Sequence, residues 1–191
     1  MLAEYKISLP PQTLETADGR ARAVLEKAQK QVGFIPNMYS NMVHSPAVLD
    51  TYLDGYAAFR KDSGFTPVEQ EVVFLVISRE NGCEYCVSAH SFLADKASGV
   101  PTAITDAIRD GRSLTDAKLE ALADLTRTMV NSRGLPGRVQ VERFLSAGYS
   151  ERQILEIVLA IAVKTLSNYT NHLFHTALDD MFAARKWSDG A

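Results

Sequence analysis

The chain has 191 residues, of which 46% are hydrophobic and 23% are charged, as in an ordinary globular protein of one domain or two small halves. Its net charge of −3 gives it no attraction to nucleic acid or to anionic membranes, and no run is long and apolar enough to span a bilayer. The first residues lack the pattern of a signal peptide. With two cysteines the chain is not a secreted disulfide scaffold, so we expect a cytoplasmic protein with a redox or metal role.

Hydrophobic periodicity and capping signals predict an all-α fold in one domain, residues 1–191, with no strand. Residues 1–16 are expected to form a polar arm over the surface. Helices are expected at residues 17–31, 37–43, 46–62, 67–80, 83–97, 101–109, 115–131, 138–147 and 150–184, the last with a bend near residue 168. Because a thioredoxin fold needs alternating strands and helices, the C-x-x-C pair of this chain does not sit on that scaffold.

The stretch from Glu71 to His90 carries the chemistry. Cys83 and Cys86 form a C-x-x-C pair, and His90 follows Cys86 by four residues, so one helical face presents two thiols and an imidazole. Asn81-Gly82 interrupts the apolar run before them, which predicts a helix end there and a new helix beginning near Cys83. A thiol at a helix N-terminus is favoured as the reactive thiolate, so the pair is a candidate dithiol/disulfide couple.

Glu71 joins this group only if the chain folds back. On one straight helix it would lie roughly 18 Å from Cys83, at 1.5 Å per residue. In a helical hairpin spanning residues 66–98, Glu71 and His90 lie at comparable distances from the bend and face each other. Burial in the surrounding apolar run is expected to raise the pKa of this carboxyl.

A faint internal repeat relates residues 66–98 to residues 150–184. Sliding one segment onto the other places Cys83 on Ser167 and Cys86 on Thr170. The second segment is therefore a candidate degenerate copy of the hairpin that lacks the thiols.

Glu71, the pair Cys83-Glu-Tyr-Cys86 and His90 at this spacing resemble the active-site pattern of the alkylhydroperoxidase D-like (AhpD-like) proteins of the carboxymuconolactone decarboxylase superfamily. The length, the arm and the segment Asn168-Tyr-Thr-Asn171 resemble its peroxidase-related branch. The resemblance implies an all-helical fold of helical-hairpin repeats, a homo-oligomer, and a hydroperoxide reductase without haem, metal or other cofactor.

The same resemblance implies roles for single residues. Cys86 would attack the peroxide and Cys83 would resolve the product to a disulfide, which an external dithiol or reductant protein would reduce. Glu71 and His90 would form the proton relay. Better-known members carry a histidine where this chain has Tyr85, which can hydrogen-bond in the relay but cannot shuttle protons near neutral pH.

Other interpretations of these residues stay open at this stage. The cysteines could be small core residues without a chemical role, and Glu71 could be a buried structural carboxylate paired with an arginine. Cys83, Cys86, His172 and His175 fit a zinc site. A redox sensor or structural oligomer without turnover, a disulfide reductase and a lactone decarboxylase-type enzyme are further alternatives. Apolar positions in residues 48–59 and 154–161 predict an oligomer.

Overall fold

The computed structural model describes residues 2–188, which form nine α-helices and one 3-10 helix and contain no strand. The elements are α1 (Gly19–Val32), α2 (Asn37–Met42), α3 (Pro46–Asp62), α4 (Pro67–Glu80), α5 (Glu84–Lys96), α6 (Thr102–Arg109), α7 (Ala117–Asn131), α8 (Arg138–Ser146), α9 (Glu151–Phe174) and η1 (Asp180–Arg185). The all-α class predicted from the sequence is confirmed. No helix within residues 2–188 is both long and apolar enough to cross a membrane.

Helix boundaries follow the local signals in the sequence. Thr66 and Glu69 exchange both hydrogen bonds of a capping box at the start of α4, and Ser150 does the same with Gln153 at the start of α9. Gly82 ends α4 in the left-handed region, with φ 64°. The backbone N–H of Gly82 donates to Arg79 and that of Cys83 donates to Ser78, which is the pattern of a Schellman motif.

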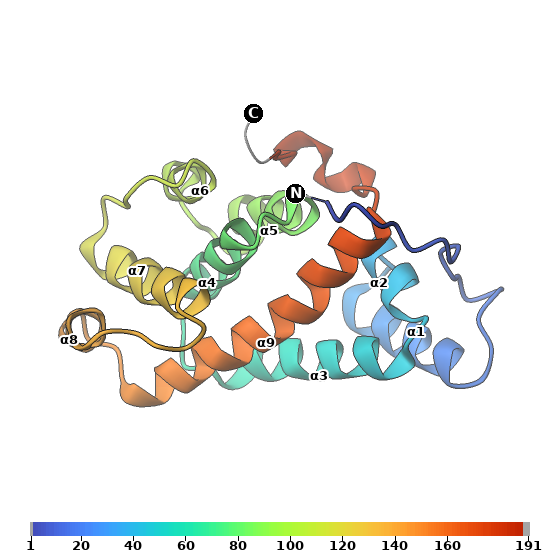
Figure 1. Ribbon diagram of the computed structural model, residues 1–191, viewed down its shortest axis with the longest axis horizontal. Coiled ribbons are helices and arrows are strands. Elements are labelled where there is room, and N and C mark those ends of the chain that lie inside the picture. Colours follow the sequence, from blue (N-terminus) through green and yellow to red (C-terminus); the bar gives the residue numbers. More distant parts are fainter. Residues whose placement is uncertain (1, 189–191) are drawn as a thin grey trace.

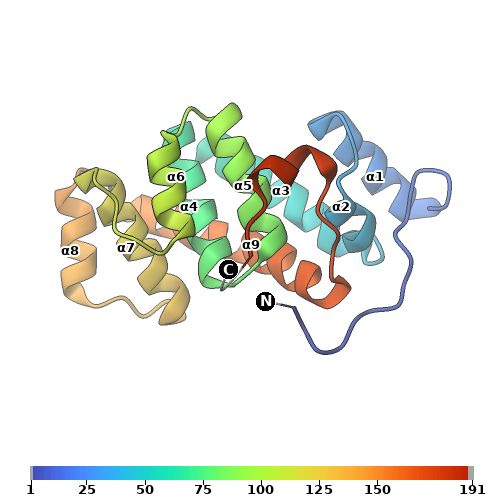
Figure 2. The same ribbon diagram turned by 90° about the horizontal axis from the view of Figure 1, so that it is seen from above.

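The helices surround two hydrophobic clusters that meet at the α4–α5 hairpin (Figures 1 and 2). At one end of the molecule α6 and α7 pack against α4, and α8 packs against α7, while α1 and α2 lie at the other end. Helix α3 packs along α9, and both connect the two ends. Tyr56 of α3 and Leu159 of α9 contact both clusters. The cysteines belong to the second cluster, so they lie at the junction between the two ends.

The arm at residues 2–18 runs over the carboxyl end of α9 and the α2 region and contains a turn at residues 14–16 (Figure 1). Its backbone donates hydrogen bonds from Ala3 to His172 and from Gln12 to Ser40. Backbone pairing of this kind fixes the arm without the apolar periodicity of a helix.

The last helical region extends less far than predicted. Helix α9 is continuous through Asn168 and ends at His175, which has φ 51°. Side-chain contacts with distant elements hold the chain beyond that point: His175 bonds the carbonyl of Ala3 at 2.7 Å, and Asn41 donates to Thr176 at 3.0 Å. These tertiary contacts, which local periodicity does not encode, replace a longer helix by an extended link and a 3-10 turn.

Two expectations about assembly and repeats stay predictions. The degenerate second copy at residues 150–184 begins with a matching capping box, but α9 has no bend where the hairpin of α4 and α5 turns. The apolar positions that predicted an oligomer are partly used inside the monomer, since Leu49, Tyr52, Phe59 and Ile157 are buried. Exposed apolar side chains on α9 are Leu155, Val158, Tyr169 and Leu173.

The Thr66 cap provides a test of this local account. Thr66→Ala removes the hydrogen bond to the Glu69 N–H and is expected to lower the free energy of unfolding by about 1 kcal/mol, which corresponds to a fall in Tm of roughly 2–4 °C for a chain of this size. Thr51→Ala, at an exposed position inside α3, is the control for loss of a threonine. Equal melting temperatures for the two variants would contradict the capping assignment.

Candidate active site

The Schellman turn at Gly82 delivers the two cysteines to the first turn of α5. Cys83 is the N-cap of α5, Cys86 follows one turn later, and both are free and buried. The amide nitrogen of Asn171, on α9, lies 3.3 Å from the Cys86 sulfur and 3.8 Å from the Cys83 sulfur. Cys86 Sγ is also 3.9 Å from Ser167 Oγ. Two helices far apart in the sequence therefore enclose one dithiol.

The two thiols differ in acidity. Burial alone would raise the pKa of Cys86, but the Cys83 thiol donates to its sulfur and Lys164 lies nearby as a positive charge, so that the pKa is well below its ordinary value. Burial and the neighbouring Cys86 sulfur raise the pKa of Cys83 well above its ordinary value. The expectation that this pair contains a thiol favoured as thiolate thus applies to Cys86, while the pKa of Cys83, which donates to the Cys86 sulfur, moves the other way.

Glu71 lies on α4, the first helix of the hairpin, at the centre of a cluster of buried polar side chains. Its side chain is fully buried, and one carboxylate oxygen accepts from His90 Nδ1 at 2.8 Å while the other is paired with Arg60. Ser98 donates to the latter oxygen at 3.4 Å. The fold-back that Glu71 needed to reach His90 is thus present, and so is the arginine partner of the structural interpretation.

The predicted rise in the Glu71 pKa is wrong. Burial does oppose ionisation, but His90 and the Arg60 guanidinium outweigh it and hold the pKa of Glu71 below its ordinary value. Ionised Glu71 therefore stabilises the fold at neutral pH, and this contribution is lost only in acid, as the pH falls through the lowered pKa.

One ring nitrogen of His90, Nδ1, is engaged in the hydrogen bond to Glu71. Burial and the positive charge of Lys164 lower its pKa despite the neighbouring carboxylate of Glu71, so the ring is neutral near pH 7. Because Nδ1 faces an ionised carboxylate, that nitrogen carries the proton. The lone pair on Nε2 is then left as an acceptor beside the cavity.

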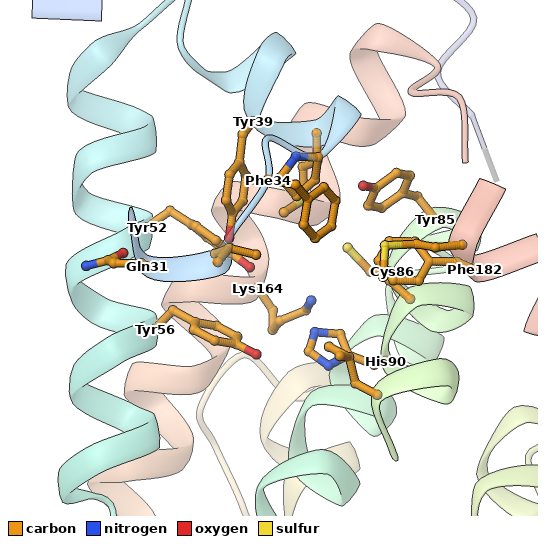
Figure 3. A pocket seen from close by; sticks show the side chains of 16 residues that line it. Gln31, Phe34, Tyr39, Tyr52, Tyr56, Tyr85, Cys86, His90, Lys164 and Phe182 are labelled. Atoms are coloured by element: carbon orange, nitrogen blue, oxygen red, sulfur yellow. The ribbon is translucent and has the colours of Figure 1, made fainter. Parts of the chain in front are cut away.

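A cavity of about 340 Å³ opens onto these groups (Figure 3). Aromatic side chains from four elements form most of its wall, and the polar groups that reach it are few; the labelled wall residues are Gln31, Phe34, Tyr39, Tyr52, Tyr56, Tyr85 and Phe182. Cys86, His90 and Lys164 also line it, whereas Cys83 does not. A small ligand in the cavity can therefore reach the Cys86 sulfur directly but not that of Cys83.

Tyr85 belongs to the cavity wall. Its hydroxyl donates to Asp179 Oδ2 at 2.5 Å, and the other oxygen of Asp179 accepts from the backbone N–H of Asn37 at 3.1 Å. Tyr85 thus ties the link before η1 to α2 and α5, and its hydroxyl is directed away from the Glu71–His90 pair to this carboxylate.

Several residues of the site were missed from the sequence. Arg60 donates to Tyr56 at 2.7 Å and to Gln70 at 3.1 Å, and it reaches Glu71 from α3. Helix α9 contributes a buried polar strip on one face: Lys164, Ser167, Asn168 and Asn171. Three of these residues were named for the repeat or the resemblance, but none of the four was assigned to the site from the sequence. A signal for this strip exists, because polar residues three or four apart interrupt the apolar face of a helix that is otherwise core-facing.

The residues suggested as zinc ligands are not brought together. No cluster of three or more metal-ligating side chains occurs within residues 2–188. His175 bonds the arm at Ala3, and His172 lies on α9 with its ring stacked on Tyr169 at 6.2 Å between centres. The structure thus offers no zinc geometry to the described part of the chain.

Comparison with known proteins agrees with this arrangement. Residues 46–128 match the model of the carboxymuconolactone decarboxylase family. This segment contains Glu71, Cys83, Cys86 and His90, whereas the polar strip of α9 lies beyond it. A search of curated proteins found no match.

Solved structures share the fold over most of the chain. An uncharacterized peroxidase-related protein from Ralstonia eutropha JMP134, described as an alkylhydroperoxidase AhpD core, superposes with a TM-score of 0.78 at 21% identity, covering 91% of this chain and 93% of that one. An uncharacterized peroxidase-related protein from Silicibacter sp. TM1040 gives 0.76 at 18% identity, covering 96% and 97%. A cysteine-to-alanine variant of the debrominase Bmp8, in complex with 2,3,4-tribromopyrrole, gives 0.76 at 16% identity, covering 94% and 96%. At these identities the likeness establishes the fold.

The acidity difference between the thiols can be measured by alkylation. In Cys83→Ser the serine hydroxyl still donates to the Cys86 sulfur, so Cys86 is expected to react with iodoacetamide at a pH well below the ordinary cysteine pKa of ~8.5. In Cys86→Ser the remaining thiol is expected to react only in alkaline solution. The alkylation rate of each variant is measured as a function of pH. If both rates rise with the same alkaline midpoint, the assignment of the thiolate to Cys86 is contradicted.

Proposed function

We propose that the chain, which belongs to the carboxymuconolactone decarboxylase superfamily and has an AhpD-like fold, is a cysteine-based hydroperoxide reductase. The observation that carries this proposal is the position of Cys86, a thiol with lowered pKa at the wall of an apolar cavity, beside His90. Peroxide reduction needs a thiolate that a peroxide can reach, together with groups that handle protons at the same point.

The proposed cycle has three steps. The Cys86 thiolate attacks the outer oxygen of the hydroperoxide, so that an S–O bond forms, the O–O bond breaks and an alcohol leaves once its oxygen is protonated. Cys83 then attacks the sulfur of the resulting sulfenic acid, forming a disulfide and releasing water. An external dithiol supplies two electrons and two protons and restores both thiols.

Glu71 and His90 act as the proton relay in this scheme. Glu71 fixes the imidazole through Nδ1, and Nε2 accepts the proton as a thiolate forms. The apolar wall favours an organic hydroperoxide over hydrogen peroxide, because a hydrocarbon group gains free energy by leaving water for such a cavity. The partners that we propose are a hydroperoxide substrate, an external dithiol reductant and further copies of this chain in a homo-oligomer.

A second candidate is reductive dehalogenation of an aromatic compound. Two observations favour it: the fold is shared with the debrominase Bmp8, and tyrosine rings line the cavity beside the Cys86 thiolate. In such a reaction a carbon–bromine bond would be replaced by carbon–hydrogen while a dithiol becomes a disulfide. Release of bromide from a brominated pyrrole in the presence of a dithiol, with no consumption of hydroperoxide, would favour this candidate over the first.

The hydroperoxide proposal is tested by single-turnover reaction of the reduced protein with cumene hydroperoxide. The wild type is expected to consume one equivalent and lose two thiols to an intramolecular disulfide. Cys83→Ser is expected to consume one equivalent and retain a sulfenic acid on Cys86 that dimedone traps, while Cys86→Ser consumes none. Trapping on Cys83, or no consumption by the wild type, would refute the proposal.

The relay is tested by Glu71→Gln and His90→Gln. Each is expected to slow oxidation of Cys86 by roughly ten- to a hundred-fold, as loss of an acid/base group does, and to remove a limb of the pH–rate profile. Because Glu71 is also paired with Arg60, rates are compared per folded molecule below the melting temperature. Glu80→Gln, which alters another ion-paired carboxylate of α4 away from the cavity, is the matched control. Unchanged oxidation rates in both relay variants would leave Glu71 as a structural ion-pair partner.

A further inference from the structure

Lys164 is a fully buried cation that the relay does not use. Its ammonium has no hydrogen-bond partner within residues 2–188, and Nζ lies 5.7 Å from the centre of the Phe74 ring. Figure 3 shows the side chain extending from α9 into the cavity, toward His90 and Cys86. Burying an ammonium without hydrogen bonds or a counterion is strongly unfavourable, so this position requires a compensating anion.

The Cys86 thiolate is the anion available to Lys164. The buried carboxylate nearby, Glu71, is already held by Arg60 and His90. The residues that line the cavity include no carboxylate, and the positive charge of Lys164 contributes to the lowered pKa of Cys86. Lys164 and Cys86 therefore line the same cavity as a buried cation and the thiol whose ionised form it favours.

Peroxide cleavage also needs a proton for the leaving oxygen. Because the pKa of His90 is lowered, a proton that Nε2 accepts as the thiolate forms passes on to solvent before the peroxide binds, and His90 then has none to give. Its ring is neutral, and the one N–H that it carries is directed to Glu71. Lys164 presents N–H donors with no hydrogen-bond partner within residues 2–188, on the wall of the same cavity that Cys86 lines.

We propose that Lys164 is a further catalytic residue, which donates a proton to the alkoxide oxygen as the O–O bond breaks. The proposal rests on the proposed hydroperoxide reductase function. In this step the Cys86 thiolate and R–O–O–H, with the Lys164 ammonium, yield Cys86–S–OH, R–OH and a neutral Lys164 amine. The sulfur is oxidised by two electrons and the peroxide is reduced by two. The amine takes a proton from solvent before the next turnover.

The test compares two leaving groups in one pair of proteins. Cumene hydroperoxide leaves a strongly basic alkoxide that needs a proton, whereas a peroxycarboxylic acid leaves a carboxylate that needs none. Lys164→Met keeps an unbranched side chain of similar size. It is expected to slow oxidation of Cys86 by cumene hydroperoxide on the order of 100-fold, and oxidation by peroxybenzoic acid far less. Rates are measured where the ultraviolet absorbance of the thiolate shows Cys86 ionised in both proteins.

The outcomes separate this role from a merely electrostatic one. Equal slowing with both oxidants would mean that Lys164 acts only on the thiolate, and no slowing would mean that it has no part; either result overturns the proposal. Lys96→Met, at an exposed position of α5, controls for loss of one positive charge. Lys164→Arg keeps the charge but does not give up a proton, so it is expected to leave the alkyl hydroperoxide rate low.

The wild type provides an independent measurement if Lys164→Met does not fold. Across a series of hydroperoxides, its rates are expected to depend weakly on the basicity of the leaving oxygen, because an internal donor protonates it. A steep dependence would overturn the proposal. If the wild type reacts with neither oxidant, the hydroperoxide reductase function itself fails, which is a different result from loss of selectivity in the variant.

Discussion

The buried carboxylate of Glu71 is the interaction on which the rest of the site depends. A fully buried charge must be paired and hydrogen-bonded, and here Arg60 of α3, His90 of α5 and Ser98 share that task. Each partner comes from a different part of the chain, so satisfying one carboxylate fixes how α3, α4 and α5 pack. The hydrogen bond from His90 also fixes the tautomer of its imidazole. The need to pair a buried charge therefore also sets which nitrogen of His90 is free to accept a proton.

The dithiol depends on a second polar contact, between α5 and α9. Asn171 reaches both sulfurs, Ser167 lies next to Cys86, and Lys164 enters the cavity below them. Arg60 and Glu71 form a buried ion pair, and the positive charge of Lys164 helps to lower the pKa of Cys86. Such pairs gain little net stability because both ions lose their hydration, so their presence in the core is more readily explained by reactivity than by stability.

The cavity sets what this reactivity can act on. Its wall is mainly aromatic and apolar, while its charged groups gather at one side around Cys86 (Figure 3). Low polarity strengthens the electrostatic effect of each charge on a reacting atom. Tyr85 and Asp179 close the wall by joining α5 to the link before η1, so the residue that replaces the histidine of better-known AhpD-like proteins contributes to the shape of the cavity.

The sequence alone determined most of the helices, the break at Asn81-Gly82 and the candidate set Glu71, Cys83, Cys86 and His90, because caps, glycines and helical periodicity are local properties. It also indicated that Glu71 needed a partner. Only the tertiary structure decided which partners it has, which thiol is the acidic one, and that α9 ends at His175. Arg60 lies in an ordinary amphipathic helix, where nothing in the local pattern separates a surface cation from a buried one. The spacing of Lys164 with the polar residues after it indicates a polar strip, but not which groups that strip faces. The charge state of a buried group depends on neighbours distant in the chain, and those neighbours exist only once the helices have packed.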